Sequence, residues 1–244
     1  MRERILIVGA TSDMGQAFAR RCALRGAELI LAARDAVALD RLASDLRVRV
    51  GGTVHTVEFD ALKMEEHAEF YRDLPVRPDG VICFVGWLGE AEVCQQSFEA
   101  ARRVLDTNFT GVVSVLDRVA EEFEKRGKGW IVGVSSVAGD RGRAPRYHYG
   151  SAKAGLNAYL SGLRQRLWRS RVLVMNVKPG YCRTKMVAGW DLPGAMTSEP
   201  DEVAGAILRA IDRGQETLYV RWMWRWIMGI IRLLPEPIFK RLKI

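Results

Sequence analysis

Short β-rich runs alternate with longer amphipathic stretches along the 244 residues, and this alternation restricts the folds that the chain can adopt. Parallel strands joined by crossover helices produce such a pattern. We expect strands near residues 4–8, 28–33, 53–59, 80–85, 130–135, 171–177 and 217–220. Helices are expected near 14–25, 35–47, 63–73, 99–126, 150–168 and 201–213. The pattern predicts an α/β fold, a single doubly wound domain with a seven-stranded parallel sheet.

The composition fits one large core and an intracellular protein. An apolar share of 48% suits an undivided α/β domain, and no linker or repeat interrupts residues 1–220. The first expected strand begins at residue 4, which leaves no room for a signal peptide, so we expect a cytoplasmic protein. The scattered cysteines lack a CxxC pair, which argues against a zinc site or a disulfide framework. They are Cys22, Cys83, Cys94 and Cys182, and we predict no metal.

A glycine-rich turn stands between the first expected strand and the first expected helix. Gly9 permits a tight turn, and Gly15 permits close packing of the helix on the sheet. The free N–H groups at a helix start carry partial positive charge and can bind a pyrophosphate. An ordinary strand-to-helix turn with Ser12 or Asp13 as N-cap is the alternative. The position favours a dinucleotide site that includes Gly9, Thr11, Ser12, Asp13, Met14 and Gly15.

The second expected strand ends in Ala33-Arg34-Asp35, where the adenosine ribose of a dinucleotide would lie. A carboxylate at the last strand position selects NAD, whereas an arginine after a small residue can pair with the 2′-phosphate of NADP. Arg34 therefore favours NADP(H) over NAD(H), and we expect Asp35 to cap the next helix. Asp60 follows the third strand, where it either bonds the adenine amino group or serves only as an N-cap.

Five motifs in order make the chain resemble the short-chain dehydrogenase/reductase family over nearly its whole length. They are the turn at 9–15, NFTG with Asn108, VSSVAG with Ser136, YGSAK with Tyr149 and Lys153, and Pro179-Gly180 followed by Thr184. The resemblance implies a Rossmann-type NAD(P)-binding reductase domain over residues 1–220. In this family the catalytic serine commonly stands 13 residues before the tyrosine, which selects Ser136 over Ser135.

The same resemblance implies the role of each site residue. Asn108, Ser136, Tyr149 and Lys153 would be catalytic, with Asn108 holding a water in a proton relay. Thr184 would contact the nicotinamide carboxamide. The full set of implied cofactor-binding residues is Gly9, Thr11, Ser12, Asp13, Met14, Gly15, Arg34, Asp60, Gly86, Tyr149, Lys153, Pro179, Gly180 and Thr184.

The pairing of Tyr149 with Lys153 explains how a tyrosine could act as an acid. A free phenol has a pKa near 10 and transfers protons slowly at neutral pH. Lys153 stands at i+4, on the same helix face, where its ammonium and the positive ring of an oxidised nicotinamide would favour phenolate. We expect Tyr149 to protonate a ketone oxygen that Ser136 hydrogen-bonds, while Lys153 also holds the nicotinamide ribose.

Two departures from the family pattern bear on cofactor binding. Asp13 stands where the family usually has its middle glycine, and a carboxylate there repels a pyrophosphate unless it turns away or binds N–H groups. The fourth expected strand runs into Cys83-Phe84-Val85-Gly86, where an Asn-Ala-Gly sequence is usual. This second change removes a polar support for the strand and leaves the catalytic groups untouched.

Residues 221–244 form a second unusual region, expected to be an amphipathic C-terminal extension. As one helix, it would gather its charges in a sector of roughly 100°. These residues are Arg221, Arg225, Arg232, Glu236, Lys240 and Lys243. The apolar stretch 222–234 is about 20 Å long as a helix, too short to cross about 30 Å of hydrocarbon. Tryptophans beside basic residues favour a helix lying on the membrane surface. A homo-oligomer interface is the alternative.

The excess of 37 basic over 29 acidic residues is concentrated in this tail, and no nucleic-acid-binding motif accompanies it, so we expect no nucleic-acid partner. The tail motif WRWIM and LLPEPIFKRL resembles the family branch that includes decaprenyl-phosphoryl-2-keto-erythro-pentose reductase. That resemblance implies a lipid-linked ketone, a keto-sugar on a polyprenyl phosphate used in cell envelope biosynthesis. Two interpretations remain open: a ketoreductase of a soluble or lipid-like small molecule such as a steroid, polyketide or acyl group, and a non-enzymatic dinucleotide-sensing protein.

Overall fold

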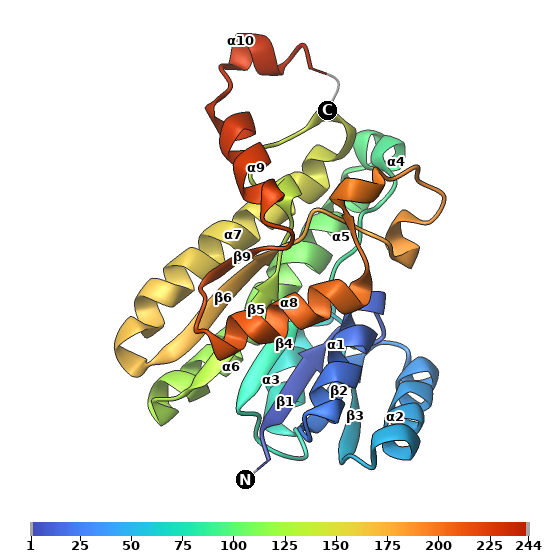
Figure 1. Cartoon of the computed structure of the whole chain (residues 1–244), viewed down its shortest axis with the longest axis vertical. Coiled ribbons are helices and arrows are strands. Elements are labelled where there is room, and N and C mark those ends of the chain that lie inside the picture. The colour runs from blue at the N-terminus through green and yellow to red at the C-terminus, as the bar shows by residue number, and fades with distance from the viewer. Residues whose placement is uncertain (1, 243–244) are drawn as a thin grey trace.

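Seven parallel strands form the central sheet of the computed structural model, which describes residues 2–242 (Figure 1). The strands are β1 (Arg4–Val8), β2 (Glu28–Ala33), β3 (Val54–Glu58), β4 (Gly80–Cys83), β5 (Gly129–Val134), β6 (Val172–Lys178) and β9 (Thr217–Tyr219). Their order is β3-β2-β1-β4-β5-β6-β9, so the direction of winding reverses between β1 and β4. In such sheets ligands bind at the carboxyl ends of the strands near this reversal. The predicted fold class is confirmed.

Helices cover both faces of the sheet because alternate strand residues point to opposite sides. Ile5 and Ile7 of β1 join one core with α1 (Asp13–Leu24), α2 (Ala36–Val50) and α8 (Pro200–Asp212). Leu6 and Val8 join the other core, with α3 (His67–Arg72), α6 (Gly111–Arg126) and α7 (Tyr147–Leu167). Figure 1 shows α1 and α8 on one face of the sheet and α6 and α7 on the other.

The segment expected as one helix at 99–126 is divided into three parts. α5 (Phe98–Leu105) is followed by a π-helical stretch, Asp106–Thr110, and then by α6. A π-helical turn widens the helix locally, and such turns are frequent at functional sites. Here the turn contains Asn108, one of the predicted catalytic residues, whose side chain is fully buried.

Several short elements escaped prediction because they are too short for a periodic pattern. They are α4 (Ala91–Gln96) and a separate parallel pair of two-residue strands, β7 (Tyr181–Cys182) and β8 (Thr197–Ser198). Short 3₁₀ turns occupy Met64–Glu66, Val137–Gly139, Ala144–Arg146, Trp168–Ser170, Lys185–Val187 and Gly194–Met196. Three of these turns, Val137–Gly139, Ala144–Arg146 and Lys185–Val187, and the strand β7 contribute residues to the wall of the candidate site.

The C-terminal segment forms two helices, α9 (Met223–Leu233) and α10 (Glu236–Phe239). The chain is extended at Leu234 before Pro235, so the expected single helix and its single charged sector are wrong. Lys243 lies outside the described residues. Trp224 and Met228 are buried against Val137, which fastens α9 to the domain. The division at residue 220 remains a prediction, although α9 shares this core.

The other side of α9 is apolar and exposed. Trp222, Trp226, Ile230 and Leu233 are between 65% and 84% exposed. At 100° per residue these four side chains fall within about 80° of the helix circumference, a strip that we call the outer ridge. Within residues 2–242 no helix is both long and apolar enough to traverse a bilayer.

Candidate active site

A cavity of about 330 Å³ lies where β5 and β6 end, and we call it the catalytic cavity. Ser136 follows β5 and Pro179-Gly180 follows β6, so the sheet itself brings these motifs together. Tyr149 enters the cavity from the first turn of α7, and Thr184 borders it from the loop after β7. Three of the five predicted motifs therefore share one cavity, which includes Ser136, Tyr149, Pro179, Gly180 and Thr184.

Lys153 lies one helical turn beyond Tyr149 and is almost completely buried, with 2% of its surface exposed. Its Nζ is 5.8 Å from the centroid of the Tyr149 ring. It donates hydrogen bonds to the carbonyl oxygens of Val134 at 3.1 Å and Val85 at 3.4 Å. These two carbonyls end β5 and follow β4, so Lys153 is held against the carboxyl edge of the sheet.

Burial determines the acid strength of both groups. It raises the pKa of the Tyr149 phenol to about 12, and the hydrogen bond with Ser136 lowers it by a smaller amount. Burial also lowers the pKa of the Lys153 ammonium to about 8. The expected lowering of the Tyr149 pKa is therefore wrong for the protein without a bound dinucleotide, because desolvation is the largest influence on the phenol. The phenol keeps its proton at neutral pH.

The two adjacent serines have different partners. The Ser135 hydroxyl donates to the carbonyl oxygen of Lys153 at 3.1 Å, which ties β5 to α7. The Ser136 hydroxyl accepts the N–H of Ala138 at 3.1 Å and is close enough to the Tyr149 hydroxyl to lower its pKa. These positions fit the preference for Ser136, whose catalytic role remains a prediction.

Asn108 is locked in place by backbone groups. Its Oδ1 accepts the N–H of Trp87 at 3.1 Å, and its Nδ2 donates to the carbonyl oxygens of Trp87 at 2.6 Å and Val104 at 2.8 Å. A Cβ added to Gly86 would stand 3.3 Å from this Oδ1 and 3.7 Å from Lys153 Nζ. Asn108 thus lies close to Lys153, and its water-holding role stays a prediction.

A second cavity of about 470 Å³, the nucleotide cavity, borders the glycine-rich turn. It is lined by Gly9, Thr11, Ser12, Arg34, Asp60 and Gly86, among other residues. Gly86 lies close to Lys153, because a Cβ added to this glycine would stand 3.7 Å from Lys153 Nζ. The nucleotide cavity therefore extends to the neighbourhood of Lys153. Gly15 packs beneath the turn instead, and Met14 lines the catalytic cavity.

The glycine-rich turn fits a dinucleotide pyrophosphate. Gly9 has a φ of +79°, and a Cβ there would stand 2.9 Å from the backbone nitrogen of Val85. The Ser12 hydroxyl caps α1 by accepting the N–H of Gly15 at 3.1 Å. Within residues 2–242 the N–H groups of Thr11, Asp13 and Met14 have no acceptor. Unpaired N–H groups at a helix start suit phosphate oxygens.

At the ribose end of the nucleotide cavity, Asp35 caps a helix and Arg34 faces the cavity. The Asp35 side chain accepts the N–H of Ala38 at 2.9 Å, so Asp35 caps α2, as predicted. Arg34 is exposed and lines the cavity. The Asp60 side chain accepts the N–H of Leu62 at 3.0 Å and still lines the cavity, so its contact with adenine remains a prediction.

Asp13 turns toward the loop after β7. Its Oδ2 accepts the backbone N–H of Lys185 at 2.7 Å. The carboxylate therefore binds an N–H group, one of the two arrangements that relieve repulsion of a pyrophosphate. This bond also connects the glycine-rich turn to the turn at 185–187, whose Met186 and Val187 line the catalytic cavity.

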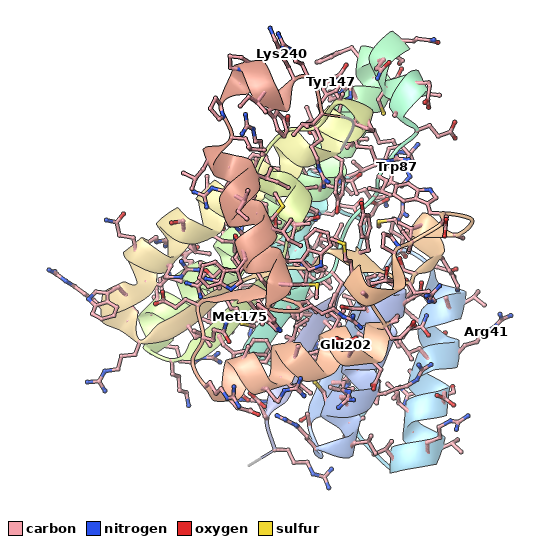
Figure 2. All side chains as sticks on the ribbon, turned by 45° about the horizontal axis from the view of Figure 1, so that its top comes forward. Arg41, Trp87, Tyr147, Met175, Glu202 and Lys240 are labelled. Atoms are coloured by element: carbon pink, nitrogen blue, oxygen red, sulfur yellow. The ribbon has the colours of Figure 1, made fainter. Side chains whose placement is uncertain are left out.

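Sequence reasoning missed several residues of the catalytic cavity, among them Arg143, Arg146 and Trp224. The arginines lie in an irregular turn, and only their position shortly before Tyr149 could have indicated them. Trp224 was assigned to a surface helix, but its ring stands so close to Gly180 that an added Cβ would be 2.0 Å away. Figure 2 shows Trp87 and Tyr147 toward the same end of the molecule as Lys240 of the C-terminal segment.

Comparison with known proteins gives the family. The sequence pattern of the short chain dehydrogenase family matches residues 3–192. The uncharacterized oxidoreductase in the mprA 5′ region of Streptomyces coelicolor is 38% identical, with 98% of this chain and 96% of that protein aligned.

Two solved structures are similar along nearly the whole chain. A short-chain dehydrogenase from Sphingobium yanoikuyae in complex with NADPH is 30% identical with a TM-score of 0.83, over 96% of this chain and 97% of that one. The bulky-bulky ketone specific alcohol dehydrogenase from Comamonas testosteroni is 26% identical with a TM-score of 0.81, over 96% and 95% of the two chains. With its seven-stranded sheet and matching sequence, this chain belongs to the short-chain dehydrogenase/reductase family of oxidoreductases.

Proposed function

We propose that the protein is an NADP(H)-dependent reductase that transfers hydride to a ketone. The observation that carries this proposal is the placement of Tyr149, beside Ser136 and one helical turn from Lys153, in a largely apolar cavity. The nucleotide cavity approaches the same lysine through Gly86. A ketone seated beside Tyr149 would therefore lie next to the reactive end of a dinucleotide.

Each side chain has a distinct task in this proposal. A bound reduced nicotinamide supplies the hydride. Tyr149 gives its proton to the ketone oxygen, and the burial that raises its pKa keeps that proton in place until the oxygen gains negative charge. Ser136 donates a hydrogen bond to the same oxygen. Lys153, while protonated, favours the phenolate left behind, and Asn108 holds the water that returns the proton.

The cofactor preference rests on Arg34. We propose NADP(H) over NAD(H) because Arg34 is free of Asp35, which caps α2. The relative from Sphingobium yanoikuyae was solved in complex with NADPH, which agrees with this preference. A guanidinium can bond a 2′-phosphate through two N–H groups, whereas a ribose hydroxyl offers it no charge.

For the substrate we propose a keto-sugar on a polyprenyl phosphate, reduced at the cytoplasmic face of the membrane. The tail resemblance suggests this carrier, and the outer ridge of α9 offers an apolar surface flanked by Arg225 and Arg232. An apolar ridge beside cations suits a headgroup region with anionic lipids. Trp224, on the opposite side of the same helix, lines the catalytic cavity.

Turnover is the direct test of the reductase proposal. The protein is mixed with NADPH or NADH and with candidate ketones, both soluble and lipid-linked, and nicotinamide absorbance is followed. We expect absorbance to fall with NADPH and with a lipid-linked keto-sugar. Reduction of soluble ketones without activity on the lipid-linked one would favour a small-molecule ketoreductase. Cofactor binding without any turnover would favour a dinucleotide sensor.

The membrane proposal needs variants that leave the core intact. Removing residues from 221 onward would also remove the buried Trp224 and Met228, so truncation confuses membrane binding with unfolding. The double variant Trp226→Ser/Ile230→Ser changes only exposed ridge positions. We expect it to lose flotation with phosphatidylglycerol vesicles, whereas Trp168→Ser keeps it, since Trp168 is also exposed but lies just after the far end of α7. A ridge variant that floats normally but no longer oligomerises would assign the ridge to a homo-oligomer interface.

A further inference from the structure

The catalytic cavity has an unbalanced charge. It is lined by 20 residues, of which Arg143 and Arg146 are the only charged ones. No aspartate, glutamate or lysine among these residues compensates the two guanidinium groups. The walls are otherwise mostly apolar, with Leu88, Val137, Met186, Trp190 and Trp224 among them. Charges among apolar walls interact more strongly with a bound ion than charges in open water do.

A short turn fixes both arginines on the cavity wall. Ala144–Arg146 is a 3₁₀ turn with Pro145 in its first positions, and Arg143 precedes it in extended conformation. Residues three apart lie on the same side of such a turn. Arg146 stands three residues before Tyr149, so the turn leads directly into the catalytic helix.

The two arginines differ in how they are held. Arg146 Nη1 donates to the carbonyl oxygen of Gly89 at 2.8 Å, and its guanidinium lies 4.7 Å from the Trp190 ring centroid. These contacts orient the group and leave most of its five donors free. Within residues 2–242 the Arg143 side chain makes no hydrogen bond and no ion pair, and only its carbonyl oxygen is bonded, by the N–H of Arg146 at 3.2 Å.

Neighbouring charges are already paired with each other. Arg141 bonds the carbonyl oxygens of Ile231 and Leu234 and the carboxylate of Glu236. The nearby Asp140 carboxylate is taken by Lys178 at 2.5 Å and by the Tyr219 hydroxyl at 2.8 Å. Arg143 therefore stands apart as a half-buried cation that no carboxylate of the described chain neutralises. Such a cation gains most from a ligand that brings the missing negative charge.

We propose that Arg143 and Arg146 form a subsite for an anionic group, phosphate in the first place, on the ketone substrate. This inference rests on the proposed reductase function and adds a specificity device to its cavity. The phosphates of a dinucleotide have other partners, since Arg34 and the glycine-rich turn line the nucleotide cavity and the two subsite arginines do not. Planar guanidinium groups bond phosphate oxygens in pairs, so the subsite selects charge and geometry together.

The test compares two soluble ketones with the same skeleton, one ending in a phosphate and the other in a hydroxyl. With NADPH and no vesicles, the wild type has the higher kcat/KM for the phosphorylated ketone. Arg143→Gln lowers the ratio of the two kcat/KM values by about tenfold to a hundredfold, the range for a lost charged hydrogen bond. Arg143→Lys retains part of the preference. Arg213→Gln is the matched control, because Arg213 is an exposed arginine at the C-terminal end of α8 and does not line the catalytic cavity. This variant keeps the wild-type ratio of the two kcat/KM values.

Other outcomes separate this inference from the proposed function. If Arg143→Gln changes both substrates equally, or if the wild type has no preference, the subsite is overturned while ketone reduction stands. If no ketone is reduced, the reductase proposal fails, and calorimetric titration with the phosphorylated ketone decides the subsite by whether Arg143→Gln abolishes binding. Binding of phosphatidylglycerol vesicles that depends on Arg143, without any preference among soluble ketones, would assign the arginine to a lipid headgroup and overturn the inference.

Discussion

The two halves of the cleft are built on different principles. In the catalytic half Lys153 and Asn108 are buried, and the polar groups of both side chains bond backbone N–H groups or carbonyl oxygens. In the nucleotide half Arg34 is exposed, and the Asp60 carboxylate accepts one backbone hydrogen bond, from the N–H of Leu62. The catalytic groups are therefore fixed by folding, whereas the nucleotide contacts form when a ligand arrives.

This difference sets the size of the expected effects. A buried, pre-positioned group acts in a medium of low dielectric constant and needs no reorganisation during reaction, so its loss is costly. An exposed group competes with water and salt, so it adjusts preference and contributes less. Substitutions in the catalytic half should therefore lower the rate strongly. Substitutions in the nucleotide half should change the choice of cofactor by a smaller factor.

The largest effect is expected for Tyr149→Phe, which removes the proton donor and keeps the ring. We expect kcat to fall by about 10² to 10⁴-fold, the usual range for general acid catalysis. NADPH binding, measured by fluorescence, should change little because the ring and Lys153 remain. Tyr147→Phe is the matched control, since Tyr147 is 42% exposed and has Ser151 rather than lysine four residues on. A fully active Tyr149→Phe enzyme would show that Tyr149 is not the proton donor, and the large effect expected for the catalytic half would be absent.

The next effect follows from the charge on Lys153. Because burial lowers its pKa to about 8, the ammonium is lost as pH rises through that value. We expect kcat/KM for reduction to be level below this pH and to fall about tenfold per unit above it. Lys153→Arg keeps a cation at all these pH values, so its falling limb should move to higher pH. If kcat/KM of Lys153→Arg falls at the same pH as in the wild type, another group is responsible for the titration. Thermal unfolding checks that the variant folds.

The same lysine links pH to stability, with a defined sign. An unfolded lysine holds its proton to a pKa near 10.5, whereas the folded Lys153 releases it near 8. Between these values the unfolded chain binds more protons, so the Lys153 contribution stabilises the fold as pH rises. Tyr149 acts in the opposite direction above its ordinary pKa of 10, because burial keeps its proton in the folded state up to about 12. Comparing wild type with Lys153→Met between pH 8 and 10 isolates the first contribution.

The catalytic half was also the more predictable from sequence. Ser136, Tyr149 and Lys153 are positioned by regular elements, since β5 ends two residues before the serine and α7 carries the other two at a fixed spacing. Periodicity places such elements well, and parallel strands bring their carboxyl ends to one edge. The sheet and most of its helices therefore followed from periodicity, and the resemblance to the family supplied the motifs that share the catalytic cavity.

Prediction failed where geometry depends on tertiary contacts. The π-helical turn around Asn108 and the pairing of β7 with β8 leave no periodic trace in the sequence. Trp224 looked like a membrane-facing residue, but the opposite face of α9 packs into the domain. The Tyr149 pKa was expected to fall because charges can be counted in a sequence, whereas desolvation requires the fold.

A smaller effect is expected at Arg34, in the exposed half. Arg34→Ser should lower the ratio of kcat/KM for NADPH to that for NADH by about fivefold to tenfold, because a partly hydrated charge pair is lost. The ratio should depend on salt in the wild type and less in the variant. Arg41→Ser, an exposed arginine on α2, is the control. An unchanged ratio in Arg34→Ser would show that another group selects the cofactor.

The smallest effect is expected at Asp13, which connects the two halves through the N–H of Lys185. Asp13→Ala removes the acceptor and should raise KM for both NADPH and ketone by about twofold to fivefold, since one exposed hydrogen bond is lost. Asp13→Asn keeps an acceptor oxygen and removes the negative charge beside the glycine-rich turn. If the bond to Lys185 is the main role of Asp13, Asn restores both KM values. If repulsion of the pyrophosphate dominates instead, Asn and Ala alike lower KM for NADPH below that of the wild type. The two variants thus decide whether this residue, unusual at its position, joins the halves of the cleft or only weakens one of them.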